Sequence, residues 1–182
     1  MSTHTSRRFL PILAAVISLA ASANVFAHTV SNAYLTFQAD AGHENQFHGE
    51  WDISLRDLNF VIGLDDNGDG NVTWGELKEH QQQISKYVYQ RLQIKLGGAA
   101  CRITPDKQWV DTHADGAYAV LFFNVKCPSR SPRVLTLDDR LLFDVDPTHR
   151  GILVFREGDE ISTALLSPAK HEINIKLPTK GG

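Results

Sequence analysis

The segment spanning residues 65–76 carries the residue types that bind a hard divalent cation. It fits the calcium-loop pattern D-x-[DN]-x-[DN]-G-x5-E at every specified position. The matching residues are Asp65, Asn67, Asp69, Gly70 and Glu76. Ca²⁺ prefers roughly six to eight oxygen ligands, which a short loop supplies by wrapping around the ion. The spacing therefore predicts a calcium site.

Each position of the pattern has its own physical role. The first, third and fifth residues offer side-chain oxygens, the seventh its main-chain carbonyl, and the ninth a direct or water-mediated contact. The last residue is a glutamate that can bind the ion with both carboxylate oxygens. Gly70 allows the sharp turn that a side chain would obstruct. The predicted ligands are Asp65, Asn67, Asp69, Asn71, Thr73 and Glu76.

This ligand set carries its formal negative charge on Asp65, Asp69 and Glu76, and extracellular modules bind Ca²⁺ with dissociation constants of about 10⁻⁴–10⁻³ M. Such loops usually work in pairs, but neither candidate for a second loop fits the pattern. Residues 111–116 place a histidine at the third position, and residues 144–155 lack both the glycine and the glutamate. A single loop indicates a fixed structural clasp rather than a sensor that opens.

The elements on either side of the loop are predicted to be helical. Apolar residues at helical spacing precede it, namely Leu55, Leu58 and Ile62. Ser54 and Asp57 are spaced as a loose capping box, so we expect a helix to begin at Ser54. A longer helix is expected from about Trp74 to Leu92, with Leu77, Ile84, Val88 and Leu92 on one face.

The remainder of the chain has the two-residue period of β-strands. Strands are predicted at residues 28–39, 46–53, 93–96, around 101, 108–113, 117–126, 133–137, 141–145, 151–155, 161–166 and 172–177. Asp115-Gly116 and residues 157–159 indicate two hairpin turns. The predicted fold is mainly β (α+β), a single antiparallel β-sandwich over residues 28–177 with a helix–loop–helix insertion at about 54–92. Residues 178–182 are predicted to be a loose tail.

Residues 1–27 have the features of a secretory signal peptide. Arg7 and Arg8 form a basic start, residues 9–20 are apolar, and residues 21–27 end in small residues with Ala27 at the cleavage position. The apolar run is shorter than the roughly 20 residues that a membrane span needs, so we expect cleavage after Ala27 rather than an uncleaved anchor. The sequence predicts a periplasmic or secreted protein without a transmembrane segment in the mature chain.

The chain has two cysteines, Cys101 and Cys127, and both follow the signal segment. An even number of cysteines in an oxidising compartment favours one disulfide. A metal pair or a catalytic thiol would be the alternative, but the cysteines lack the Cys-x-x-Cys spacing typical of such sites. We therefore expect a structural disulfide.

The histidines suggest an alternative function. Cleavage after Ala27 would leave His28 at the new N-terminus, where its amine and imidazole could chelate Ni²⁺ or Cu²⁺. His113 and His149, each near aspartates in the sequence, are candidate additional ligands. The competing interpretation is that they are turn and surface residues. The metal alternative would make the protein an accessory that partners a membrane metal permease.

Composition and motifs exclude other classes of protein. The chain is 42% hydrophobic and 21% charged, which is typical of a globular domain. Its formal net charge is −3, so a nucleic-acid partner is not expected. Gly-x-Ser-x-Gly, His-Glu-x-x-His and phosphate-loop motifs are all missing, so the chain is not expected to be an enzyme. A hydrolase using an Asp/His pair is the weakest of the three hypotheses.

Several phrases together resemble the N-terminal extracytoplasmic region of HupE/UreJ-family proteins, which are hydrogenase and urease accessory proteins. The phrases are Ala27-His28, 31–36 (SNAYLT), 51–58 (WDISLRDL), 63–76, 115–120 (DGAYAV), 140–144 (RLLFD) and 146–151 (DPTHRG). The family's membrane part is associated with nickel or cobalt uptake, and this chain stops at Gly182 without such spans. The resemblance therefore implies the soluble domain with its EF-hand-type calcium loop, and it does not imply transport. Possible partners are the calcium ion and a membrane permease or another periplasmic protein.

Overall fold

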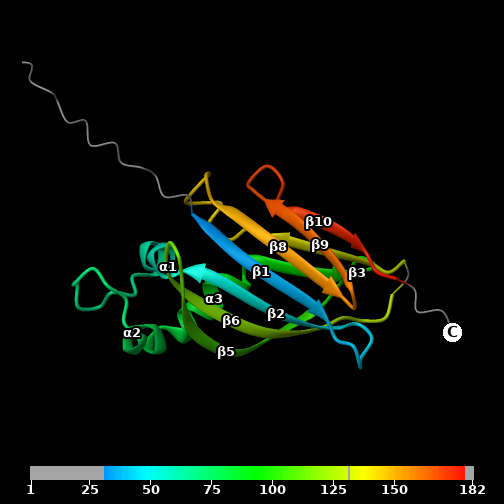
Figure 1. Cartoon of the computed structure of the whole chain (residues 1–182), viewed down its shortest axis with the longest axis horizontal. Helices are drawn as coiled ribbons and strands as arrows, with labels where there is room; N and C mark the ends of the chain where they lie inside the picture. The colour runs from blue at the N-terminus through cyan, green and yellow to red at the C-terminus, as the bar shows by residue number, and fades with distance from the viewer. Residues whose placement is uncertain (1–30, 131, 179–182) are drawn as a thin grey trace, which may run out of the picture.

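The computed structural model describes residues 31–130 and 132–178, which form two packed β-sheets with helices at one end (Figure 1). The predicted signal peptide and His28 lie outside these residues. The larger sheet contains, in spatial order, β5 (Arg102–His113), β6 (Gly116–Lys126), β2 (Gln46–Ser54), β1 (Asn32–Ala39), β8 (Arg150–Glu157) and β9 (Glu160–Leu166). The smaller contains β10 (Glu172–Lys176), β7 (Val134–Asp139), β3 (Leu92–Leu96) and β4 (Ala99–Ala100). This arrangement confirms the predicted sandwich.

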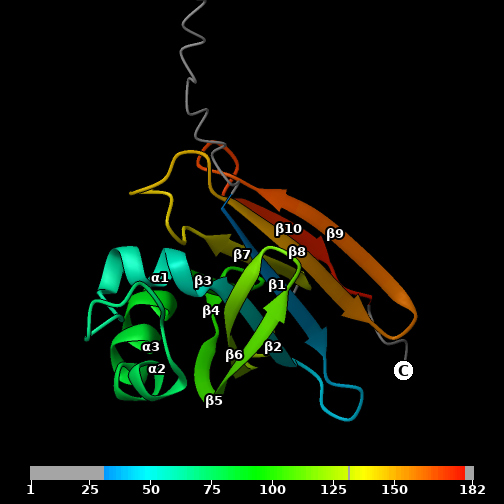
Figure 2. The same cartoon turned by 60° about the vertical axis from the view of Figure 1, so that its left-hand side comes forward.

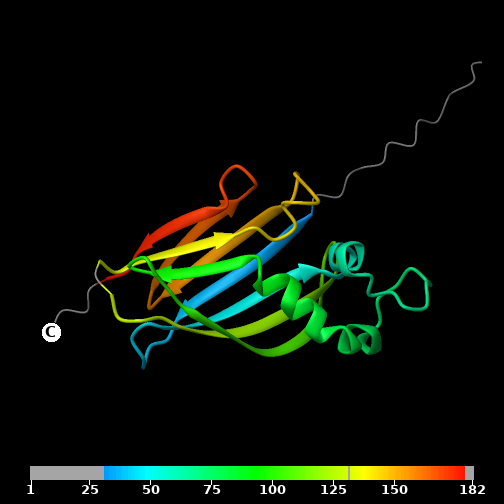
Figure 3. The same cartoon turned by 180° about the vertical axis from the view of Figure 1, so that it is seen from behind.

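The core lies between the two sheets, whose packing is seen from behind in Figure 3. Alternate residues of the large sheet point inward, so that Phe37, Trp51 and Phe123 are almost fully buried. Leu96 and Leu137 are fully buried on the face of the small sheet that packs against the large sheet. The alternation of burial along each strand is the same two-residue period from which the strands were predicted.

One strand pairing differs from the predicted antiparallel arrangement. β1 pairs antiparallel with β2 on one side and parallel with β8 on the other, with Leu35 opposite Leu153. A parallel pair requires a long crossover connection. Here most of the chain lies between the two strands, so no local turn signal could reveal the pairing.

Both predicted hairpins are confirmed. β5 and β6 pair through the Asp115-Gly116 turn, with His113 opposite Gly116, and β8 and β9 pair with Glu157 opposite Glu160. The prediction of a strand at residues 141–145 is wrong. The Asp139 carboxylate accepts a hydrogen bond from the Leu141 backbone N–H at 2.8 Å, and the chain forms turns there.

The helical insertion between β2 and β3 comprises α1 (Leu55–Ile62), α2 (Trp74–Glu79) and α3 (Gln81–Tyr89). It differs from the prediction in two ways. The single long helix is broken at His80, and Leu92 belongs to β3 instead of the helix. The predicted capping box at Ser54 is also wrong, because Ser54 makes no side-chain cap hydrogen bond. The inner faces of the helices still bury Leu58, Leu77 and Ile84 fully in the core.

The predicted disulfide between Cys101 and Cys127 is present, with the two Cα atoms 4.2 Å apart. It lies immediately before β5 and immediately after β6, beside the pair formed by Arg102 and Lys126. The bond therefore closes the open end of the β5–β6 hairpin.

A close contact across the large sheet gives a first testable prediction. Gly49 faces Phe123 in the antiparallel pair of β2 and β6, and a Cβ atom at Gly49 would overlap the Phe123 ring. We expect Gly49→Ala to lower the free energy of unfolding by about 2 kcal/mol, since overpacking a filled core forces its neighbours to move. Urea unfolding measures the change. Gly42→Ala is the control, because the nearest atom to a Cβ there is the Asp40 Oδ1 at 3.4 Å; equal effects of the two substitutions would refute the packing argument.

Candidate functional site

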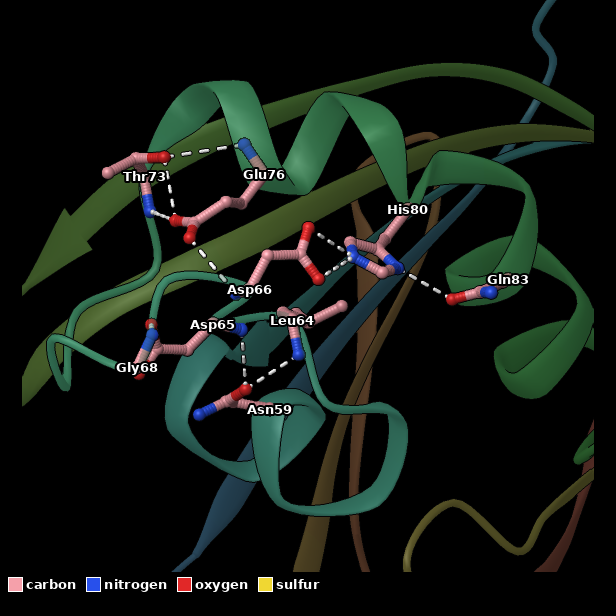
Figure 4. Close-up of polar contacts among 9 residues, drawn as sticks. All are labelled: Asn59, Leu64, Asp65, Asp66, Gly68, Thr73, Glu76, His80 and Gln83. Carbon is pink, nitrogen blue, oxygen red and sulfur yellow. Dashed lines mark hydrogen bonds and ion pairs between the residues drawn. The ribbon is translucent and has the colours of Figure 1, made fainter.

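The loop over residues 65–76 connects α1 to α2 and is fixed at its start by Asn59 (Figure 4). The Asn59 Oδ1 accepts hydrogen bonds from the backbone N–H groups of Leu64, at 2.6 Å, and Asp65, at 2.9 Å. Gly63 ends α1 in the left-handed conformation, with φ of 74°, which favours glycine. Leu64 is fully buried in the core. The first predicted ligand is therefore held at a defined place relative to α1.

Asp65 organises the first half of the loop. Its Oδ1 accepts hydrogen bonds from the backbone N–H groups of Gly68, at 2.8 Å, and Asp69, at 3.1 Å. Its Oδ2 accepts a third, from the Gly70 backbone N–H at 2.8 Å. Gly68 and Gly70 adopt φ values of 71° and 85°, which side-chain-bearing residues rarely adopt. The glycine that the pattern requires thus stands at a turn that needs it.

The next predicted ligands also turn their oxygens toward the loop backbone. The Asn67 Oδ1 accepts a hydrogen bond from the Asp69 backbone N–H, and the Asp69 Oδ1 accepts one from the Asn71 backbone N–H, each at 2.8 Å. These contacts span two residues and are typical of Asx-turns. They curl the chain tightly over the first seven positions of the pattern.

Glu76 joins the end of the loop to its beginning. Its Oε1 accepts a hydrogen bond from the Asp66 backbone N–H at 3.1 Å. Its Oε2 accepts hydrogen bonds from the backbone N–H and the hydroxyl of Thr73, at 2.8 and 2.7 Å, and Thr73 in turn caps α2. The bonds from Thr73 lower the pKa of the Glu76 carboxyl, so that it is ionised at neutral pH. The side chain at the last ligand position therefore contacts the backbone at the start of the loop.

Sequence reasoning missed a contact between the loop and the helix break. The His80 Nε2 lies 3.0 Å from the Asp66 Oδ2, and the Nδ1 lies 2.6 Å from the Gln83 Oε1 (Figure 4). The hydrogen bonds to Gln83 and Asp66 raise the pKa of the His80 imidazole. Asp66 occupies a position that the pattern leaves open, so only its place beside His80 reveals this role. The pair holds the loop against the junction of α2 and α3.

The donor chemistry of the loop fits Ca²⁺, because every predicted ligand offers oxygen and the position-12 carboxylate is folded back onto the start of the loop. The carboxylates do not converge, however: among residues 31–130 and 132–178, no three His, Cys, Asp or Glu side chains gather closely enough to hold a metal ion. The loop N–H groups occupy some of the carboxylate lone pairs instead. The Asp65 Oδ2 and the Glu76 Oε1 each accept one hydrogen bond. Because a carboxylate oxygen has two lone pairs, these two oxygens keep acceptor capacity for a cation.

A buried polar chain attaches the start of α1 to the large sheet. The hydroxyl of Ser31 donates to the Asp57 Oδ2 at 2.6 Å and lies 2.5 Å from the His149 Nδ1. His149 is fully buried, and its Nε2 has no hydrogen-bond partner within the part of the chain that the structure describes. Asp57 therefore anchors α1 through tertiary contacts instead of serving the predicted capping box. This anchor places the helix that leads into the loop.

Burial of His149 gives a second prediction. Protonation would leave an unpaired N–H in the core, and burial lowers the pKa of His149 from its ordinary 6.5 to about 4, although Asp57 and Asp146 oppose the shift. The unfolded chain binds this proton more readily than the folded protein does. The contribution of neutral His149 to the free energy of unfolding is therefore fully present above pH 6.5. It is lost as the pH falls from 6.5 toward 4, at up to about 1.4 kcal/mol per pH unit.

Urea unfolding of the wild type and of His149→Gln at several pH values tests this. The comparison is needed because burial raises the pKa of Asp139 to about 7 and that of Asp52 to about 6. These two carboxyls add stability as the pH falls, but they do so in both proteins. The free-energy difference between wild type and variant should therefore shrink below pH 6.5, and a constant difference would contradict a neutral buried histidine.

The other histidine of the alternative hypothesis is engaged in a different contact. The His113 Nε2 lies 3.3 Å from the Asp52 Oδ2, and its ring stacks on Tyr118 with the centroids 4.1 Å apart. His149 contacts Ser31, and His28 lies outside the described residues. No described contact joins His113 to His149. The nickel and copper hypothesis therefore remains a prediction from the sequence.

Comparisons with known proteins give no family assignment. No protein-family model matches the chain, and no curated protein matches it. The resemblance to the HupE/UreJ family thus remains an expectation drawn from the quoted phrases. Within residues 31–130 and 132–178, no helix has the length and apolar character needed to cross a membrane.

Proposed function

We propose that the protein is a non-enzymatic calcium-binding protein of the periplasm or the extracellular space. A single loop, residues 65–76, would bind Ca²⁺ through Asp65, Asn67, Asp69, Asn71, Thr73 and Glu76. The observation that carries the proposal is the closure of the loop, in which the Glu76 carboxylate contacts the Asp66 backbone N–H at 3.1 Å. The disulfide supports an oxidising compartment, because such bonds persist in secreted and periplasmic proteins.

The proposed role of the ion is structural. Binding would neutralise part of the negative charge that Asp65, Asp69 and Glu76 bring into one short loop. Leu64 precedes the first ligand and Leu77 follows the last, and both are fully buried. An ion shared by the two ends would therefore hold α1 and α2 together on the core. The loop would act as a clasp between the insertion and the sandwich.

Thermal and urea unfolding with and without Ca²⁺ test the proposal. At about 5 mM Ca²⁺, a dissociation constant of about 10⁻⁴–10⁻³ M raises the free energy of unfolding by roughly 1 to 2.3 kcal/mol. Glu76→Gln should lose this increase. Asp66→Asn is its matched control, because it removes an equal charge from the same loop at a position that supplies no ligand. The control should keep the full calcium-dependent increase. An unchanged unfolding curve in saturating Ca²⁺ would refute the proposed function.

A further inference from the structure

An open groove of about 750 Å³ lies beside the helical insertion. One side is formed by Trp74 at the start of α2 and by α3, and the other by edge strand β5 with Trp109. Figure 2 shows α2 and α3 next to β5. Small-molecule sites commonly have volumes of about 300–1,000 Å³, so the groove is large enough for a ligand.

Two tryptophan side chains are exposed at this groove. Trp74 is 46% exposed and Trp109 is 61% exposed, and their ring centroids lie 5.8 Å apart. The rings are inclined by 56°, so they present two faces in different directions. Trp51, by comparison, is fully buried in the core. Exposed aromatic faces from two separate elements form a contact surface that the core does not require.

The groove walls are held together by a side-chain contact. The Gln108 Nε2 donates to the Gln81 backbone carbonyl at 3.0 Å and to the Ser85 hydroxyl at 2.8 Å. These bonds connect β5 to α3. The Gln108 Oε1 is buried and has no partner among the described residues. The groove is therefore built into the fold, with an amide oxygen left unsatisfied in its wall.

The chemistry of the lining limits the class of ligand. Besides the tryptophans, it offers amides and a hydroxyl, and its two charged residues, Asp106 and Lys107, have opposite signs. A lining without net charge does not favour phosphates or nucleic acids. The lining also lacks the aliphatic side chains that an apolar peptide or a lipid would need. A neutral sugar has apolar ring faces and hydroxyl groups around its edge, which complement aromatic faces flanked by amides.

We propose that the groove formed by Trp74, Trp109 and α3 binds a neutral oligosaccharide. A sugar ring stacks on an exposed indole face, and the glutamines beside it exchange hydrogen bonds with the sugar hydroxyls. This inference does not rest on calcium binding, because Trp109 lies on β5 outside the loop.

Isothermal titration with cellohexaose, maltohexaose and hexa-N-acetylchitohexaose, up to about 10 mM each, tests the proposal, with tryptophan fluorescence as a second signal. At least one hexasaccharide should bind, and Trp109→Ala should weaken that binding by at least about tenfold. Ile161→Ala is the control, since Ile161 is 57% exposed on β9 and does not line the groove. Circular dichroism verifies that the variants remain folded.

The titrations are run both with Ca²⁺ and with a chelator, so that failure of the calcium proposal is distinguished from failure of this one. Sugar binding that persists in the chelator supports the groove even if the loop binds no ion. The proposal is overturned if none of the three hexasaccharides binds, or if either Trp109→Ala or Trp74→Ala binds as the wild type does. Preferential binding of an acidic polysaccharide such as alginate would also overturn it.

Discussion

Replacing Glu76 by glutamine is expected to lower the affinity of the proposed calcium loop for Ca²⁺ on the order of 100-fold, equivalent to about 2.7 kcal/mol of binding free energy. The substitution removes one of the carboxylates and with it the two-oxygen contact of the last loop position. The glutamine Oε1 can still accept a hydrogen bond from the Thr73 backbone N–H, which normally bonds the Glu76 carboxylate at 2.8 Å. The variant should therefore fold and differ mainly in its response to the ion.

Calorimetric titration of Ca²⁺ into wild type, Glu76→Gln and Asp66→Asn measures this effect. Asp66→Asn should bind with nearly the wild-type affinity, although it loses the contact between Asp66 and His80 at 3.0 Å. Similar affinities of Glu76→Gln and the wild type would show that the ion is not held by the predicted ligand set. Equal losses in both variants would indicate a general effect of loop charge, contrary to a specific site.

Replacing both Cys101 and Cys127 by serine lowers the free energy of unfolding by about 3 kcal/mol. The cysteines are 26 residues apart in the sequence, and the bond restricts the unfolded chain by closing that loop. It also joins the two ends of the β5–β6 hairpin, of which β5 is an edge strand with a register irregularity between Pro105 and Gln108. Without the bond, this edge strand should separate from the sheet more readily.

Urea unfolding of the double variant and of reduced wild-type protein tests the predicted contribution of the disulfide. The two should have similar stability, because both lack the covalent link and differ otherwise only in the hydroxyls that replace the thiols. Hydrogen exchange should be faster along β5 than along the central strand β1 in both samples. A loss below about 1 kcal/mol would mean that native packing alone holds the hairpin end closed.

The two proposed sites meet at the helical insertion, because the groove lies between that insertion and β5. Trp74 occupies the tenth position of the proposed calcium loop, is the first residue of α2, and lines the groove with Trp109. An ion held by the loop would therefore fix one wall of the groove. We therefore expect the sugar affinity to rise with Ca²⁺, and we expect sugar binding itself to persist without the ion.

Features that depend on neighbouring residues could be derived from the sequence alone. The loop conformation follows from Asx-turns and glycines within a few residues, so Asp65 and Gly70 are found where the pattern puts them. The Asp115-Gly116 hairpin likewise depends on local turn chemistry. The disulfide followed from the count of cysteines and the expected compartment. The alternation of apolar residues and the regular spacing of short strands predicted a sandwich correctly.

Only the tertiary structure decided the contacts between distant residues. The parallel pairing of β1 with β8, the contact of Asp66 with His80 and the meeting of Trp74 with Trp109 join segments whose spacing carries no periodic signal. Asp57 shows the reason most clearly. Its local spacing to Ser54 favoured a helix cap, but in the folded protein its carboxylate accepts a hydrogen bond from the distant Ser31 hydroxyl at 2.6 Å. Local patterns specify turns and faces, whereas packing determines which side chains meet.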